Sequence, residues 1–300
     1  MSLLINSLEQ GLVYGIMSLG VLITFRVLDF PDLTVDGSFP MGAGITASLL
    51  VVGWNPLLAI LLGIIGGISA GIFTGLLSTK LKILNLLAGI LTMTLLYSVN
   101  LRIMGRPNIP LLGEETLIDQ VDQLFGLLGL GEYSTLVFFV LLVLAIKLLL
   151  DLFFNTEIGL ALRATGDNEQ MIKAQGVNTD LMKVLGLGIS NGLVALSGGL
   201  VAQYSGFADV GMGIGTIIAG LASVIIGETL LPVKSFRWMT TAVITGSLIY
   251  RTTIMVALRY GHNLGFQSSD MKLITSMIVI LALAFPQVRE KINLHFGEEA

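Results

Sequence analysis

The most unusual chemistry in the sequence lies in the segment Leu28–Pro40, where three carboxylates and two prolines stand among apolar residues. Proline lacks a backbone N–H and restricts the residue before it, so the chain is expected to be irregular or broken here. Irregular backbone at membrane depth needs surrounding protein or a water-filled cavity, so this segment could shape one end of a polar pathway. It equally fits a solvated loop that ends in a helix capped by Asp36. The candidate pathway residues of the segment are Asp32, Thr34, Asp36 and Ser38.

Neutral polar residues are scattered through the long apolar stretches of the sequence. Their usual role in a membrane is to form hydrogen bonds between helices, although a few could contact a solute. The members of this group are Asn85, Asn100, Ser190, Asn191, Ser197 and Gln203. Of these, Asn191 and Gln203 join the candidate pathway.

Arg251 is a cation inside an otherwise apolar region, since thirteen uncharged residues precede it. An arginine at mid-membrane costs roughly 2.5–3.5 kcal/mol on insertion scales and should then face the interior of a helix bundle. We favour the alternative that Arg251 extends to the outer interface, with Tyr250 and Tyr260 as neighbouring interface aromatics. Lys147 and Asp151, four residues apart, are expected to form an ion pair within one helix.

Catalytic and metal-binding patterns are absent from the sequence. It contains no cysteine, no G-x-S-x-G, no H-E-x-x-H and no G-x-x-x-x-G-K-[ST] phosphate loop. His262 and His295 are too far apart in the sequence to indicate a metal site. We therefore predict a protein that is not an enzyme, with no catalytic residue, cofactor or metal of its own.

The elements that must position these residues are membrane-spanning helices. Hydrophobic residues make up 54% of the 300 positions and charged residues 12%, against about 25% charged residues in soluble domains. The mean hydropathy is +0.89. The net charge of −4 gives no reason to expect a nucleic-acid partner. Because Glu9 stands near the start without a basic region, the N-terminus is expected to begin the first span and not a cleaved signal.

Nine uncharged stretches are candidates for spanning helices, which need about 20 apolar residues each. The run Gly37–Thr79 supplies two of them, divided at Gly53–Pro56, and two of the nine are short enough to be re-entrant or broken. The others are Gly11–Phe25, Ile83–Leu101, Ser134–Ile146, Val184–Ala208, Val210–Gly227, Trp238–Tyr250 and Leu273–Val288. The predicted fold is an all-α polytopic membrane protein of about 8–10 spanning or broken helices, in one transmembrane domain over residues 1–300.

The distribution of basic residues predicts the orientation. If Arg26 and the Lys80/Lys82 turn are cytoplasmic, alternation places the N-terminus outside and the C-terminus, with Arg289 and Lys291, inside. The loop 105–133 is then external and the loop 155–183 cytoplasmic. Exceptions at or near the outer side are Arg102, Arg106, Arg251, Arg259 and Lys272.

The cytoplasmic loop 155–183 is expected to hold two short helices that form a docking surface. Glu157–Thr165 can form the first helix. In the second, Asp167 has the position of an N-cap with Gln170 at the third helical residue, and Gly176 is placed to end the helix.

This loop also carries a family resemblance. The string EIGLALRATGDN, residues 157–168, followed by Ala174 and Gly176, resembles the ATPase-coupling segment of bacterial ABC importer permeases, and in particular the branched-chain amino acid permease family. The strings SNGLVALSGGL at 190–200 and IIAGLASVIIGE at 217–228 are similar to the same family's downstream spans. Residues 28–44 resemble a subfamily that works with a lipoprotein-type solute-binding protein, some members of which are associated with aromatic amino acids.

The resemblance implies a permease of the bacterial plasma membrane that moves a small solute, an aromatic or branched-chain amino acid, by alternating access. The implied partners are a cytoplasmic ATPase subunit, which binds ATP and Mg²⁺, an external solute-binding lipoprotein and a second permease copy. A homodimer is favoured, although a second, different permease stays possible. The implied ATPase-coupling residues, with Gly159 and Gly166 permitting close approach and a turn, are Glu157, Gly159, Arg163, Gly166, Asp167, Asn168 and Gly176.

Two other classes of membrane protein stay open as alternatives. An ion- or proton-coupled secondary transporter would need buried ionisable groups or inverted repeats, whereas the predicted spans are almost free of charge. An intramembrane enzyme fits less well, because paired carboxylates, histidines and cysteine are missing at depth.

Overall fold

The computed structural model describes residues 2–126, 131–232 and 235–261, and the single positions Leu273, Ser276, Met277 and Ile280. Predictions about Lys234, His262, His295 and the cytoplasmic C-terminus lie outside the described residues, as does most of the predicted span Leu273–Val288. Within the described part the chain is helical, apart from one ribbon of two three-residue strands. The predicted all-α class is confirmed.

The long helices coincide with the predicted apolar stretches. They are α1 Ser2–Leu22, extended by the π-helical turn η1 Ile23–Val27, α2 Val35–Val51, α3 Pro56–Thr79, α4 Asn85–Met104, α6 Ser134–Phe153, α9 Thr179–Ser205, α10 Thr216–Leu230 and α11 Phe236–Gly261. The short elements are β1 Asn108–Pro110, α5 Leu117–Gly126, η2 Gly131–Tyr133, α7 Glu157–Asp167, α8 Glu169–Ala174 and β2 Phe207–Asp209.

Five of the described helices are long and apolar enough to cross a membrane: the first from Leu4 to Val27, then α3, α4, α6 and α9. The predicted division between α2 and α3 is confirmed. Asn55 caps α3 by accepting a hydrogen bond from the backbone N–H of Leu57, and Pro56 occupies the first helical turn, where its missing N–H has no cost. The predicted span Val210–Gly227 is wrong in its first part, because helix α10 begins only at Thr216.

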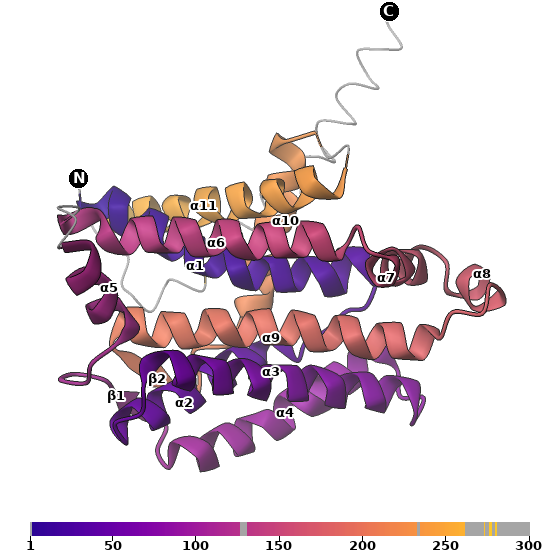
Figure 1. Cartoon of the computed structure of the whole chain (residues 1–300), viewed down its shortest axis with the longest axis horizontal. Helices are drawn as coiled ribbons and strands as arrows, with labels where there is room; N and C mark the ends of the chain where they lie inside the picture. Colours follow the sequence, from indigo (N-terminus) through magenta and orange to yellow (C-terminus); the bar gives the residue numbers. More distant parts are fainter. Residues whose placement is uncertain are drawn as a thin grey trace, which may run out of the picture.

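Helix α9 runs through the middle of the bundle and is closely approached by α2 and α3 (Figure 1). Glycines make this approach possible. A Cβ atom on Gly71 would lie 2.1 Å from the carbonyl oxygen of Leu187, and one on Gly42 would lie 2.0 Å from that of Ala195. Backbones this close leave no room for a side chain, as is usual where spanning helices pack through small residues.

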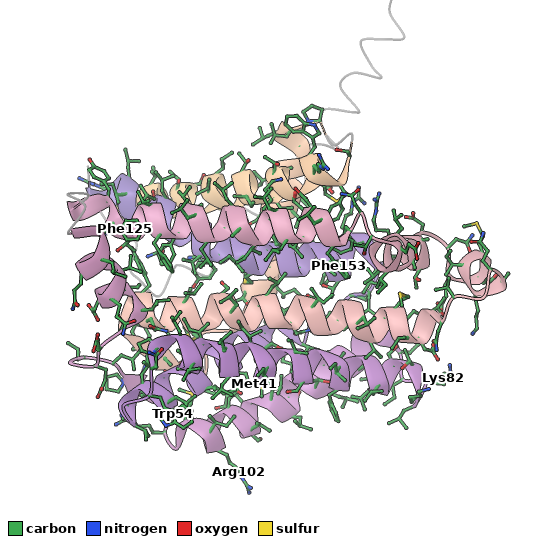
Figure 2. The ribbon with its side chains drawn as sticks, in the orientation of Figure 1. Met41, Trp54, Lys82, Arg102, Phe125 and Phe153 are labelled. Carbon is green, nitrogen blue, oxygen red and sulfur yellow. The ribbon has the colours of Figure 1, made fainter. Side chains whose placement is uncertain are left out.

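The two ends of the bundle differ in character. Helices α7 and α8 protrude at one end, whereas α5 and the β1–β2 ribbon cover the other (Figure 1). Trp54, which precedes α3, and Lys82, which follows it, lie at these opposite ends (Figure 2). In the ribbon β1 pairs antiparallel with β2, Ile109 facing Ala208. The predicted loops 105–133 and 155–183 thus lie at opposite ends of the bundle. We call the α7–α8 end the coupling end, after the coupling residues that the sequence predicts there.

Candidate functional site

Four of the predicted pathway residues form one buried hydrogen-bond network. The backbone N–H of Thr34 donates to Asp32 Oδ1 at 2.9 Å, and Asn191 Nδ2 donates to Asp32 Oδ2 at 2.8 Å. Ser38 Oγ donates to Asn191 Oδ1 at 2.6 Å. The hydroxyls of Thr34 and Thr74 are 2.7 Å apart. All five side chains have 0% of their surface exposed.

This network decides between the two interpretations of the Leu28–Pro40 segment. The chain is irregular between η1 and α2, as predicted, but a solvated loop is wrong for the polar part because Asp32 and Thr34 are fully buried. Their bonds join the break to α3 through Thr74 and to α9 through Asn191. The network therefore holds the broken segment in place between α3 and α9. Contact of these residues with a solute stays a prediction.

Asp36 acts as a helix cap, but for a helix 180 residues away. It lies in the first turn of α2, and its carboxylate accepts hydrogen bonds from the N-terminus of α10. The donors are the backbone N–H groups of Gly215 and Ile217, both at 2.9 Å, and the Thr216 hydroxyl at 3.0 Å. Carboxylates are favoured at helix N-termini, where unpaired N–H groups and the helix dipole both attract negative charge. Sequence spacing could not reveal this partner.

Gln203 lies apart from the other candidates. Its Oε1 accepts a hydrogen bond from the backbone N–H of Leu117 at 2.6 Å, which ties the end of α9 to α5. It stands 12 residues beyond Asn191 on the same helix, a separation of about 18 Å at 1.5 Å per residue. The structure therefore does not bring Gln203 together with the network around Asn191.

The side chain of Arg251 lies against helix α1. Its guanidinium carbon is 3.3 Å from the centre of the Tyr14 ring, a cation–π contact, and Tyr14 stacks on Phe39 with ring centres 5.6 Å apart. Arg251 is half-buried in this contact with α1. The predicted interface pair is wrong for Tyr250, which is 1% exposed, and the Tyr260 side chain lies outside the described part.

Helices α7 and α8 confirm the two short helices predicted in loop 155–183. Thr156 caps α7 by accepting from the Gly159 N–H, and Gly176, at φ +88°, follows the end of α8. The predicted N-cap is wrong by one residue. Asp167 is the last residue of α7, and Asn168 caps α8 by accepting a hydrogen bond from the Met171 N–H at 3.0 Å.

The two glycines of α7 face this chain's own backbone. A Cβ atom on Gly159 would lie 2.2 Å from the Phe153 carbonyl oxygen, and one on Gly166 would lie 1.9 Å from that of Val27. Gly166 is helical and makes no turn. These contacts seat α7 on the end of α6 and on η1, so the predicted close approach is made within the chain.

The other predicted coupling residues are on or near the surface. Glu157, Asp167 and Asn168 are exposed. Arg163 is half-buried, with its guanidinium 5.6 Å from the centre of the Phe236 ring. Arg163 and Asp167 also line a pocket of about 220 Å³ with Arg26, which pairs with Glu228 at 3.0 Å. The coupling end therefore presents a charged surface on a firmly seated helix.

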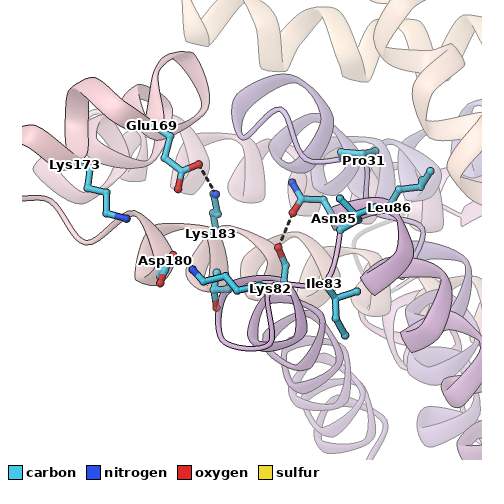
Figure 3. A pocket seen from close by; sticks show the side chains of 12 residues that line it. Pro31, Lys82, Ile83, Asn85, Leu86, Glu169, Lys173, Asp180 and Lys183 are labelled. Atoms are coloured by element: carbon cyan, nitrogen blue, oxygen red, sulfur yellow. Dashed lines mark hydrogen bonds and ion pairs between the residues drawn. The ribbon is translucent and has the colours of Figure 1, made fainter.

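A wider open pocket of about 550 Å³ lies at the coupling end between α8, the first turns of α9 and the α3–α4 turn (Figure 3). Lys183 Nζ lies 2.6 Å from Glu169 Oε2 and attaches α8 to α9, and Ser78 Oγ donates to Asn85 Oδ1 at 2.6 Å. The hydrogen bond from Lys183 holds the pKa of the Glu169 carboxyl below its usual value.

Two polar links between helices go beyond the sequence predictions, one of them in part and the other entirely. The predicted pair of Lys147 and Asp151 is confirmed at 2.5 Å, but Asp151 also accepts a hydrogen bond from Thr240 of α11 at 2.8 Å. At the opposite end the Tyr204 hydroxyl donates to Glu9 Oε2 at 2.8 Å, and Glu9 is 5% exposed. A carboxylate inside an apolar stretch was the only available signal for the second link.

Comparisons with known proteins agree with one another. Residues 3–284 match the family model described as branched-chain amino acid transport system / permease component. The chain is 49% identical over 284 residues to the tyrosine transport system permease protein of Clostridioides difficile (strain R20291), covering 95% of this chain and 91% of that one. It is 29% identical over 280 residues to the ribose import permease protein RbsC of Bacillus subtilis (strain 168), covering 93% and 82%.

A solved structure has the same fold. PsaBC from Streptococcus pneumoniae, determined in complex with Fab, matches with a TM-score of 0.53 over 92% of this chain and 89% of that chain. The sequence identity is 18%, so this match bears on the fold alone.

Proposed function

Because this chain belongs to the branched-chain amino acid permease family, a family of multi-pass membrane transporters, we propose that it is the membrane-spanning subunit of an ABC importer for an amino acid with an aromatic side chain. The observation that carries the proposal is the match over residues 3–284, joined by the 49% identity to a tyrosine transport system permease protein.

The energy for transport is proposed to come from a separate ATPase subunit. The sequence has no phosphate-binding loop, so ATP and Mg²⁺ would be bound by that partner. The exposed residues Glu157, Asp167 and Asn168, with Arg163 beside them, supply a surface on which an ATPase can seat. Gly159 and Gly166 contribute by fixing α7 to η1 and α6, so that a push on α7 is transmitted to α1.

The proposed mechanism is alternating access between two permease copies. ATP binding would close the ATPase pair, and the movement of α7 and α8 would change the end at which the pathway is open. A solute-binding lipoprotein would deliver the amino acid at the end formed by α5 and the β1–β2 ribbon. This arrangement requires the N-terminus outside and the coupling end in the cytoplasm of a bacterium, as the basic residues predict.

Uptake into proteoliposomes tests the proposal. The permease would be reconstituted with its ATPase and binding protein, with ATP enclosed on the ATPase side and labelled tyrosine, leucine or ribose offered on the other. We expect ATP-dependent accumulation of tyrosine. This accumulation should be lost in Arg163→Glu, because the reversed charge would weaken the seating of the ATPase on α7. Leu144→Ala, on the exposed face of α6, is the matched control and should transport normally.

Two outcomes would contradict the proposal. Tyrosine uptake by the permease without any ATPase would exclude the coupling role. Uptake that collapses with a proton uncoupler while ATP stays high would favour the secondary transporter instead.

A further inference from the structure

The guanidinium of Arg251 lies near the middle of the membrane-spanning part of α1. Helices α1 and α11 pack side by side (Figure 1), and the Ser247 hydroxyl donates to the Gly11 carbonyl at 2.8 Å one helical turn before Arg251. Tyr14, whose ring centre is 3.3 Å from the guanidinium carbon, is the eleventh of the 24 residues in the span Leu4–Val27. At 1.5 Å per residue, Tyr14 stands about 15 Å from one end of this span and about 20 Å from the other. The charge therefore lies at depth and not at an interface.

This charge has no carboxylate partner among the described residues. Arg251 takes part in no ion pair there, and its Nε atom is enclosed by protein without a hydrogen-bond acceptor. The two terminal nitrogens have no acceptor in the described part of the chain either, but unlike Nε they keep accessible surface. The face of the Tyr14 ring attracts the charge but offers no lone pair to the five N–H donors of a guanidinium. An ionisable group at this depth usually pairs with an anion or marks the path of a ligand.

The other cations of the spans show the contrast. Lys147, which also lies inside an apolar helix, pairs with Asp151. Arg102 and Arg259 have no ion-pair partner in the described part, but both are exposed and stand in the last turn of their helices. Among the described cations, only Arg251 combines a position near mid-span with the lack of a carboxylate.

The carboxylates in the interior of the bundle are already engaged, so none of them is held in reserve for Arg251. Each accepts hydrogen bonds from side chains or backbone groups of this chain. They are Glu9, Asp32, Asp36 and Asp151. An anion for Arg251 must therefore come from outside the described part of the chain.

The aromatic rings beside Arg251 lead into the bundle. Tyr14 stacks on Phe39 of α2 with ring centres 5.6 Å apart, and Phe39 follows Ser38, the α2 member of the buried polar network. Phe39 is fully buried, whereas Tyr14 is half-buried. The planar guanidinium presents two parallel donors that match the two oxygens of a carboxylate, and aromatic rings pack favourably on one another. An arginine beside a pair of rings thus suits an amino acid with an aromatic side chain.

We propose that Arg251 binds the carboxylate of the transported amino acid during its passage, with the terminal nitrogens donating to the two oxygens and the Tyr14 ring holding the guanidinium in place. This inference rests on the proposed function for the identity of the solute. Lipid does not take this place at mid-span, because hydrocarbon offers no acceptor. A carboxylate of a second permease copy has the same chemistry as the solute, and the experiment separates these two sources.

The test is equilibrium binding of labelled tyrosine and labelled tyramine to the purified transporter, two permease copies with the ATPase, without the solute-binding protein. Tyramine keeps the ring and the amino group but lacks the carboxylate. We expect it to bind at least roughly tenfold more weakly than tyrosine, because two charge-assisted hydrogen bonds are lost. Arg251→Gln should weaken tyrosine binding by a similar factor and leave tyramine binding unchanged. Arg259→Gln, the same change at an exposed position of α11, is the matched control and should bind both ligands like wild type.

Absent tyrosine binding, or equal binding of tyrosine and tyramine to the wild type, would overturn the inference, as would undiminished tyrosine affinity in Arg251→Gln. Separation of the two permease copies in Arg251→Gln, measured by chemical cross-linking, would assign the guanidinium to a carboxylate of the second copy and also overturn it. If Arg251→Gln fails to insert, Arg251→Lys takes its place. This variant keeps the charge but loses the two-donor geometry, so its tyrosine affinity should fall between those of wild type and tyramine.

The same measurements separate this inference from the proposed function. Carboxylate-dependent binding at Arg251 without ATP-driven tyrosine uptake would retain the site and reject the proposed function. ATP-driven uptake by a transporter that binds tyrosine and tyramine equally would do the reverse.

Discussion

At the scale of single residues, Asn191 is the junction of the buried polar network. Its amide donates to Asp32 and accepts from Ser38, so one side chain joins α9 to the break before α2 and to the first turns of α2. A second donor contact of the same amide, to the Leu187 carbonyl at 3.0 Å, fixes its orientation on α9. The amide is suited to this position because it both donates and accepts, which no charged side chain of similar size can do.

We expect Asn191→Leu to lower stability by about 1–3 kcal/mol, because Asp32 and Ser38 are left buried with fewer partners. The measurement is thermal unfolding of the purified protein in detergent. Asn85→Leu is the comparison: Asn85 is half-buried at the coupling end and accepts one hydrogen bond, from Ser78, so its loss should cost less than the loss of Asn191. Equal melting temperatures for the two variants would contradict the prediction.

At the scale of elements, α7 is held on η1 and on the end of α6 by its glycine contacts, and it presents charged residues at the surface. The string that resembles the family's coupling segment therefore combines two kinds of residue, those that seat the helix and those that stay available to a partner. Only the three-dimensional contacts separate Gly159 and Gly166 from Glu157 and Asp167.

Gly166→Ala should displace α7, because its Cβ would lie 1.9 Å from the Val27 carbonyl oxygen and backbone cannot yield cheaply. We expect a loss of about 1–3 kcal/mol in stability and a clear fall in ATP-driven uptake. Gly126→Ala is the control, since no atom lies within 4 Å of the added Cβ. Unchanged unfolding and uptake in Gly166→Ala would show that α7 does not need this contact.

The attachment of α8 to α9 should depend on pH. The pKa of Glu169 is lowered by its bond to Lys183, so this pair stabilises the fold above the ordinary value of 4.5 and the contribution disappears as the pH falls through the lowered folded value. At neutral pH Glu169→Gln should cost about 0.2–1 kcal/mol, since the pair is partly exposed. In melting experiments at pH values from 7 down through the acid range, the difference between wild type and Glu169→Gln should shrink as the pH falls below 4.5. A constant difference would reject the ion pair as its cause.

At the scale of the whole molecule, the bundle is built around the close contact of α9 with α2 and α3, and two interruptions of helix meet near its middle. One is the break before α2 and the other is the segment before α10. Asp36 joins them, because it belongs to the first turn of α2 and caps α10. The Asp36 carboxylate therefore connects the two breaks directly.

Gly71→Ala should disturb the whole bundle, since the added Cβ would lie 2.1 Å from the Leu187 carbonyl oxygen and force α3 away from α9. We expect about 1–3 kcal/mol of destabilisation or failure to insert. Gly188→Ala, on the same interface, meets its nearest atom at 3.4 Å and should be neutral or slightly stabilising. Thermal unfolding and membrane yield of the two variants provide the measurement, and similar losses in both would contradict the glycine-packing interpretation.

The class of the protein and the position of most helices follow from the sequence alone. Long uncharged stretches, the division at Gly53–Pro56 and the two short helices of loop 155–183 all follow from local rules of hydropathy and capping. Such rules consider only a few neighbouring residues, so they can misplace a helix boundary by one position. At the start of α8 both Asp167 and Asn168 could serve as the cap, and Asn168 does so.

The partners of the polar residues, in contrast, are set by how the helices pack. The partner of Asp36 is 180 residues away, the partner of Arg251 is a ring on α1, and the partner of Gly166 is a carbonyl oxygen of η1. The composition of Leu28–Pro40 fits either a solvated loop or a buried junction. The free energy of burying a carboxylate depends on the hydrogen-bond donors around it. Those donors are brought together by helix packing, which no spacing along the chain records.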